Sequence, residues 1–149
     1  MSQVSTTWDV RSVLEPLVEF ADAIDGYPVQ SLLLICLQTL GADRETRRRN
    51  LRFACMALGG WIAGLTRDID GLDPVGPDNQ TAMRRQLSVT RDGLVCARAI
   101  LDRLAELCPD NVDAAQTRHA VSSVPAQRAL SSISDCRPAL AHRASLLSS

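Results

Sequence analysis

The residues best suited to chemistry in this chain are arginines, which crowd into one short segment. Five of them stand within nine positions: Arg44, Arg47, Arg48, Arg49 and Arg52. A guanidinium group donates paired hydrogen bonds to phosphates and carboxylates, so this cluster predicts an anion-binding surface. Only Asp43 and Glu45 offer carboxylates nearby, and like charges at this density repel one another. We therefore expect a bound polyanion, the alternative being a solvated helix face beside carboxylates.

A second basic feature follows later in the chain, at Arg84 and Arg85, with Arg91 one to two turns further on. If the two halves of the chain pack side by side, this feature could merge with the first cluster into one face. Taken alone, Arg84 and Arg85 are better interpreted as an ordinary exposed pair. We expect them to add less to polyanion binding than the first cluster.

One long helix is expected to position the first cluster, running from about Asp43 towards Asp70. The Asp43 side chain can accept a hydrogen bond from a free backbone N–H at the helix start. At 3.6 residues per turn, Arg44, Arg48 and Arg52 lie on one side. The core side is expected to carry Leu51, Cys55, Leu58 and Ile62. Glycines at 59, 60 and 64 either weaken the second half of this helix or permit close helix contact.

Apolar residues recur at three- and four-residue steps through most of the chain, which predicts helices. One helix is expected before Ile24, kinked or divided at Pro16, and another is expected after Pro28. A further helix should run from 78–81 to Cys108, with Thr90 and Gly93 as points where it could break. A weaker one passes through His119, another opens at Pro125, and at most one short helix fits beyond Cys136. No sustained alternation predicts a strand, so we expect an all-α fold with at least six helices.

The segment 70–78, DGLDPVGPD, is the clearest linker, because Gly, Pro and Asp interrupt two periodic regions there. The sequence thus predicts two packed helical subdomains joined by an acidic Gly/Pro linker. Their expected bounds are 1–72 and 79–149, the second ending in a candidate flexible tail. Limited proteolysis should cut first within the linker.

Signals of catalysis are weak. His119 and His142 are isolated, and no pair of Cys or His residues has the spacing of a metal site. No nucleophile elbow or glycine-rich phosphate loop occurs. We expect no enzyme activity and no catalytic, cofactor-binding or metal-binding residues. The five cysteines are scattered, which is typical of reduced thiols, and the chain is expected to contact membranes only peripherally.

Overall composition narrows the kind of anion binding. All sixteen basic residues are arginine, and acidic residues balance them to a net charge of -1. Any binding of polyanions must therefore come from local charge separation. Aromatic residues make up only 3%, which argues against a base-stacking platform for single-stranded nucleic acid.

Three segments resemble influenza-type (orthomyxovirus) matrix proteins. LQTLGADRETRRRNLRFACMALGG (37–60) is similar to a buried helix, a polar turn and an Arg-rich helix of that family. PDNQTAMRRQL (77–87) resembles its loop into a basic, nuclear-localisation-type helix, and GLVCA (93–97) resembles part of a later helix. The segments occur in the family's order and cover about a third of the chain, although the second basic patch lacks lysine.

The resemblance implies a viral matrix protein with an all-helical, two-subdomain fold. Such a protein would self-associate into a layer in the virion, under the envelope, and would pass through the host cytoplasm and nucleus. Its partners would be acidic phospholipid, bound peripherally, and viral ribonucleoprotein or RNA. The binding residues would be the first cluster with Arg84 and Arg85. The alternative is an intracellular helical adaptor that binds a partner protein through an apolar groove.

Overall fold

The computed structural model describes residues 7–24, 27–39, 43–72, 78–107, 118–121 and 123–148. Its helices are α1 (Val10–Ala23), α2 (Val29–Thr39), α3 (Arg44–Asp70), α4 (Asp78–Leu107) and α5 (Val124–Ser148). Two short strands, β1 (Thr7–Asp9) and β2 (Arg118–Ala120), pair antiparallel with Trp8 opposite His119. Apart from this small ladder, the described part of the chain is all-helical, as the periodicity predicted.

Local hydrogen bonds explain where two of the long helices begin. Asp43 caps α3, and its carboxylate accepts a hydrogen bond from the Thr46 backbone N–H at 2.9 Å. The Ser123 hydroxyl accepts one from the Ala126 backbone N–H at 3.2 Å at the start of α5. Both bonds satisfy an N–H group that the first turn of a helix leaves without a partner.

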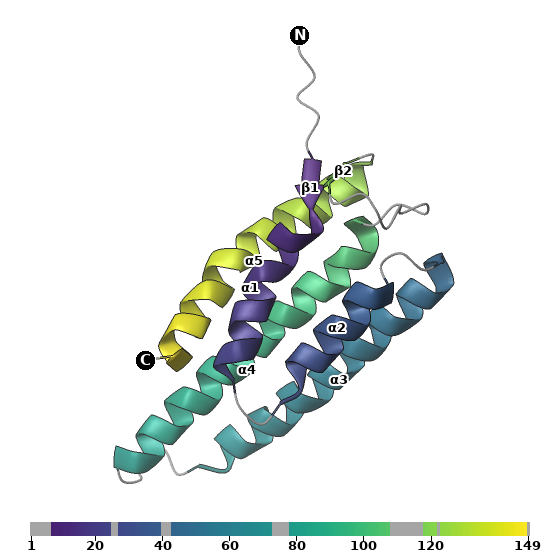
Figure 1. The fold of residues 1–149 in the computed structure, drawn as a ribbon. Coiled ribbons are helices and arrows are strands. Elements are labelled where there is room, and N and C mark those ends of the chain that lie inside the picture. Colours follow the sequence, from purple (N-terminus) through teal and green to yellow (C-terminus); the bar gives the residue numbers. More distant parts are fainter. Residues whose placement is uncertain are drawn as a thin grey trace.

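The helices pack mainly around α4, which lies in the middle of the molecule (Figure 1). Helices α3 and α4 form an antiparallel hairpin, and α5 packs along the other side of α4. Helix α1 packs chiefly on α5, whereas α2 packs on α3, where the rings of Tyr27 and Trp61 lie 5.5 Å apart. The Arg143 guanidinium on α5 lies 4.0 Å from the Asp92 carboxylate on α4.

All five helices contribute to one cluster of buried apolar residues. Its fully buried members include Phe20 of α1, Leu58 of α3, Leu104 of α4 and Leu140 of α5. At Gly93 the backbone of α4 comes so close to α1 that an added Cβ would lie 2.1 Å from the Phe20 ring. Gly93 is therefore a packing residue rather than a break in α4, contrary to one expectation from the sequence.

Two other positions where a helix could have divided, Pro16 and Thr90, do not divide it; a kink at Pro16 stays a prediction. Pro16 stays inside α1, where it is buried and lies in the same hollow between α1 and α5 as Pro138. A proline removes one helical hydrogen bond, but burial against a neighbouring helix compensates for that loss. Thr90 stays inside α4 because its hydroxyl donates to the Gln86 carbonyl oxygen at 3.0 Å, within the helix itself.

The C-terminal part of the chain is more regular than its composition suggested. Helix α5 continues past Cys136 as far as Ser148, with Leu140 and Ala144 buried, so this segment extends a long helix and is not a short helix of its own. The flexibility of the tail stays a prediction. The expected weak helix through His119 is replaced at residues 118–120 by strand β2. The described residues form five helices rather than at least six, because the helices are longer than predicted.

Residues from both predicted halves, 1–72 and 79–149, belong to the same core cluster. The division between them remains a prediction. Most of the linker, residues 73–77, lies outside the described part of the chain.

Candidate anion-binding site

The first arginine cluster occupies the N-terminal turns of α3, and its position depends on the cap. Thr46 donates from its backbone N–H and from its hydroxyl to the two carboxylate oxygens of Asp43, each at 2.9 Å. The backbone hydrogen bond, followed by the hydroxyl, lowers the pKa of the Asp43 carboxyl below its ordinary range. The cap predicted from the sequence is thus confirmed, and it occupies one of the two carboxylates near the cluster.

The arginines of the cluster differ in exposure. Arg48, Arg49 and Arg52 are exposed, as expected for a binding surface. Arg47 is only 2% exposed, so the structure does not support its predicted place on that surface. The reason is its position around the helix. Arg47 precedes the buried Leu51 by four residues, so it lies on the same side of α3 as Leu51, Ala54, Leu58 and Leu65. The Arg44 side chain lies outside the described part.

Exposed arginines of α3 have little compensation from carboxylates. Arg49 lies 3.5 Å from Glu45, one turn earlier on the helix, and both side chains are mostly exposed. Such a surface pair contributes little to stability, so it remains open to exchange with an external anion. Within the described part of the chain, neither Arg48 nor Arg52 forms a salt bridge.

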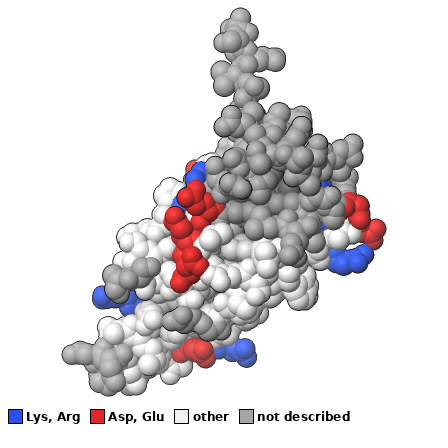
Figure 2. All heavy atoms as spheres, in the orientation of Figure 1, with Lys and Arg blue, Asp and Glu red and all other residues white. Residues whose placement is uncertain are grey.

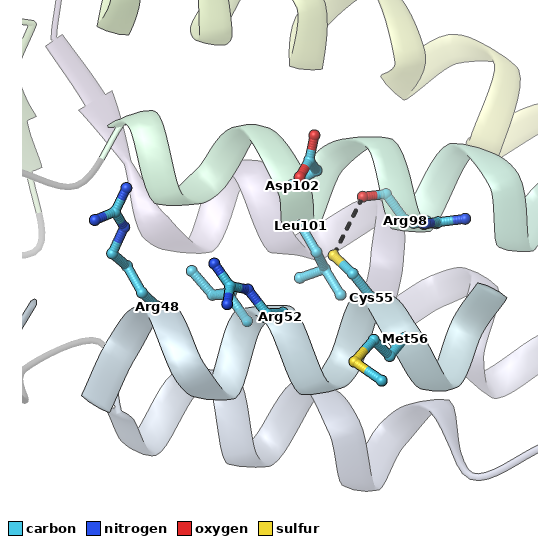
Figure 3. A pocket seen from close by; sticks show the side chains of 8 residues that line it. Arg48, Arg52, Cys55, Met56, Arg98, Leu101 and Asp102 are labelled. Carbon is cyan, nitrogen blue, oxygen red and sulfur yellow. Dashed lines mark hydrogen bonds between the residues drawn. The ribbon is translucent and has the colours of Figure 1, made fainter. Parts of the chain in front are cut away.

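A groove of about 370 Å³ lies between α3 and α4, beside these arginines (Figure 3). From α3, the side chains of Arg48 and Arg52 extend towards α4 along this groove, whereas Met56 points away from α4. The residues that line it are Arg48, Leu51, Arg52, Cys55, Met56, Arg98, Leu101 and Asp102. Three guanidinium groups and one carboxylate thus surround a partly apolar depression.

Arg98 brings a cation from α4 that the sequence analysis did not assign. Its carbonyl oxygen accepts a weak hydrogen bond from the Cys55 thiol at 3.9 Å. Its guanidinium lies beside Gly59 of α3: a Cβ added to Gly59 would be 3.2 Å from Arg98 Nη1. Gly59 therefore leaves room for the end of the Arg98 side chain, whereas Gly60 and Gly64 face open space. No spacing in the sequence pairs residue 59 with residue 98; only the register of the hairpin does.

A second hollow, of about 550 Å³, adjoins the groove on the outer side of α3. It is lined by Glu45, Arg48, Arg49 and Arg52, so the two depressions share Arg48 and Arg52. We call Arg48, Arg49, Arg52 and Arg98 the arginine site. The arrangement allows an anion with several phosphates to contact more than one guanidinium group at once.

The second basic feature does not join the arginine site. Arg84 is half-buried and donates from Nη2 to the Leu72 carbonyl oxygen at 2.6 Å, which ties α4 to the end of α3. Arg85 is exposed. At 1.5 Å per residue, Arg85 lies about 20 Å from Arg98 along α4. Because α3 and α4 run antiparallel, the two basic features stand near opposite ends of the hairpin, and the expected merged face is not formed.

Several acidic side chains gather on α1. Figure 2 shows a strip of acidic atoms in the region of α1, with arginine atoms towards the edges of the same view. Exposed carboxylates on α1 come from Glu15, Glu19 and Asp22. An anion would therefore be repelled by the α1 face and attracted by the arginine site.

The cysteine thiols near the groove are held in their neutral form. Burial raises the pKa of Cys36 to about 11, with a smaller contribution from Cys55. Burial also raises the pKa of Cys55, assisted by Asp102 and opposed by Arg98. The four cysteines in the described part are free thiols, and Cys108 lies outside it. Neutral thiols are poor nucleophiles, so Cys55 serves the groove as an apolar wall.

In the described part of the chain, no three His, Cys, Asp or Glu side chains come together as a group that could hold a metal ion. Within the same residues, no helix is both long enough and apolar enough to span a bilayer.

Comparison of the chain with protein-family models, with curated proteins and with solved structures gives no match, so the interpretation of the arginine site rests on its own geometry.

Proposed function

We propose that this protein is a non-enzymatic helical binding protein that holds polyanions at the arginine site. The observation that carries the proposal is the pair of adjoining hollows that share Arg48 and Arg52. Neither of these arginines forms a salt bridge within the described residues, and Arg98 approaches from a second helix. Guanidinium groups on a firm helical hairpin suit a ligand that presents several phosphates in a row.

The position of the site at the start of α3 supports the same ligand chemistry. A helix carries a partial positive charge at its N-terminus, which adds to the field of the arginines. Only Glu45 is acidic in the first turn of α3. Binding of phosphates by such a site releases counterions, so its affinity should fall steeply as salt is added.

The matrix role implied by the resemblance is part of this proposal. In that role, copies of the protein associate with one another under a viral envelope and contact acidic lipid and ribonucleoprotein. The chain would act as two helical halves, 1–72 and 79–149, joined at segment 70–78. The adaptor function is the second candidate, and the exposed apolar residues Leu34 and Phe53, 55% and 58% exposed, favour it.

The test is a triple substitution, Arg48→Gln, Arg49→Gln and Arg52→Gln, which leaves the buried Arg47 in place. The matched control replaces three exposed arginines elsewhere, Arg67, Arg103 and Arg128, and changes the net charge equally. Binding to a single-stranded RNA and to phosphatidylserine vesicles is measured over a range of salt concentrations. The logarithm of affinity should fall by roughly 0.7 to 0.9 per phosphate neutralised for each unit of log salt.

We expect the α3 triple variant to bind more weakly, with a flatter salt dependence, and the control to stay close to the parent. Equal losses in both variants would mean that binding follows net charge alone, without a site. Unchanged affinity and slope in the α3 triple variant would refute polyanion binding at α3 and favour the adaptor function.

A further inference from the structure

The outward side of α3 presents apolar side chains among its arginines. Phe53 and Met56 are 58% and 68% exposed, although both are large hydrophobic residues. At 100° per residue, Arg49, Arg52, Phe53 and Met56 fall within about 100° of one another around the helix. We call these four residues the α3 outer face. It follows that one convex helical surface offers cations and apolar groups side by side.

An acidic lipid surface fits this combination of groups. In an interfacial helix, cations contact headgroup phosphates while aromatic and aliphatic side chains enter the boundary with the acyl chains. Arginine assists, because its apolar stem can follow the hydrophobic residues while its guanidinium stays at the phosphates. The surface is also backed by a long helix with a buried opposite side, at Leu51, Ala54 and Leu58, so it need not fold on binding.

Nucleic acid fits the α3 outer face less well. RNA would use the arginines in the same way, but it gains from apolar residues chiefly by stacking bases on aromatic rings. Phe53 is the only aromatic residue among the four, and Met56 offers no ring. A polyanion bound by charge alone would leave both side chains in water.

We propose that the α3 outer face docks onto acidic phospholipid membranes, with Arg49 and Arg52 at the headgroup phosphates and Phe53 and Met56 inserted at the headgroup–acyl boundary. The inference rests on the proposed function, since Arg49 and Arg52 also belong to the arginine site. It goes further by assigning lipid, rather than nucleic acid, to the α3 outer face and by giving two uncharged residues a role in binding.

The experiment separates the apolar contribution from the electrostatic one. The double variant Phe53→Ser with Met56→Ser is compared with the control Met83→Ser with Val95→Ser, which removes two exposed apolar side chains from α4, 52% and 47% exposed. Each full-length protein is sedimented with vesicles of phosphatidylserine and phosphatidylcholine at low and high salt, and is titrated with single-stranded RNA. Circular dichroism and thermal melting show whether each variant keeps its fold.

The α3 double variant should bind the acidic vesicles about tenfold to a hundredfold more weakly, because two large side chains no longer leave water. Its RNA affinity and the vesicle affinity of the control should match the parent. At high salt, residual vesicle binding should persist in the parent and disappear in the double variant. A Phe53→Trp variant should keep full affinity and gain tryptophan fluorescence that acyl-chain-brominated lipids quench, beyond the signal of Trp8 and Trp61 in the parent.

Failure of this inference and failure of the proposed function have different signatures. If the α3 arginine triple variant loses vesicle binding while the Phe53 and Met56 double variant keeps it, the arginine site stands and insertion is refuted. If the double variant loses RNA and vesicle binding equally, the two side chains do not serve lipid insertion, and the inference also fails. If the arginine triple variant binds as the parent does, the proposed function itself fails.

Discussion

The contact between Gly93 and Phe20 allows the packing of α4 to be tested by a single added methyl group. In Gly93→Ala, the new Cβ would lie 2.1 and 2.2 Å from two carbons of the Phe20 ring, whereas ordinary contacts measure 3.4–4 Å. The ring or the helix must therefore move by more than an ångström. Phe20 is fully buried, so it has no route into solvent, and the displacement must be absorbed by the core.

Overpacking of this kind costs about 1–3 kcal/mol, while alanine gains about 1 kcal/mol over glycine inside a helix. We expect Gly93→Ala to lower the free energy of unfolding by up to about 2 kcal/mol. Gly60→Ala is the matched control, because an added Cβ there meets nothing within 4 Å. The control should be neutral or more stable by up to about 1 kcal/mol.

Urea unfolding, followed by circular dichroism, measures both variants against the parent. At this chain length, 1 kcal/mol corresponds to a shift in Tm of about 2–4 °C, so thermal melting should separate the two alanine variants. Phe20→Leu should partly relieve the cost in the Gly93→Ala background, which would appear as coupling in a double-mutant cycle. The reasoning is refuted if Gly93→Ala is as stable as Gly60→Ala.

Two further predictions follow from the pKa shifts. The pKa of Asp43 is lowered in the folded state, so its ionised cap stabilises the fold at neutral pH, and that contribution is lost as the pH falls through the folded pKa. Asp43→Ala should thus be less stable than the parent at neutral pH, by a margin that shrinks in acid; an equal margin at both pH values would contradict this. Burial raises the pKa of Cys36 to about 11, so iodoacetamide should label it slowly in the native protein at mildly alkaline pH. After denaturation without reductant, all five cysteines should be labelled, and fewer would indicate a disulfide.

The sequence predicted long, well-capped helices better than short or proline-containing ones. The bounds of α3 and α4 agree with the predicted ones to within a few residues, because each helix has a long core stripe and α3 also has a capping residue at each end. The sequence left Pro16 open between a kink and a helix boundary, since local propensity disfavours proline in a helix; in the structure it lies inside α1, which packs on α5. The extent of α5 was hidden by its Ser- and Ala-rich composition, where small buried residues such as Ala144 give a weak periodic signal.

At the arginine site, charge density indicated a candidate segment but not which of its side chains would be exposed. Arg47 and Arg48 are neighbours, yet one is buried and the other exposed, because one residue turns the helix by 100°. The buried residues Leu58, Ala54 and Leu51 are spaced by four and three residues, and one further step of four leads to Arg47. This spacing could have assigned Arg47 to the buried side. Arg98 could not have been found in this way, since only the register between α3 and α4 brings it to Gly59.

The place of the cluster in α3 also has an energetic consequence. Like charges three or four residues apart on a helix repel one another, and each such pair costs about 0.2–0.5 kcal/mol. Arg52 follows Arg48 by four residues and Arg49 by three, and Glu45 is the one acidic residue in the first turn of α3. Selection for stability alone would favour neutral or acidic residues there. The cluster therefore fits a protein that is slightly less stable when free and is stabilised by a bound anion. The glutamine substitutions in α3 should therefore stabilise the free protein slightly while they weaken binding. Because misfolding would lower both quantities together, this opposite movement distinguishes loss of a binding site from damage to the fold.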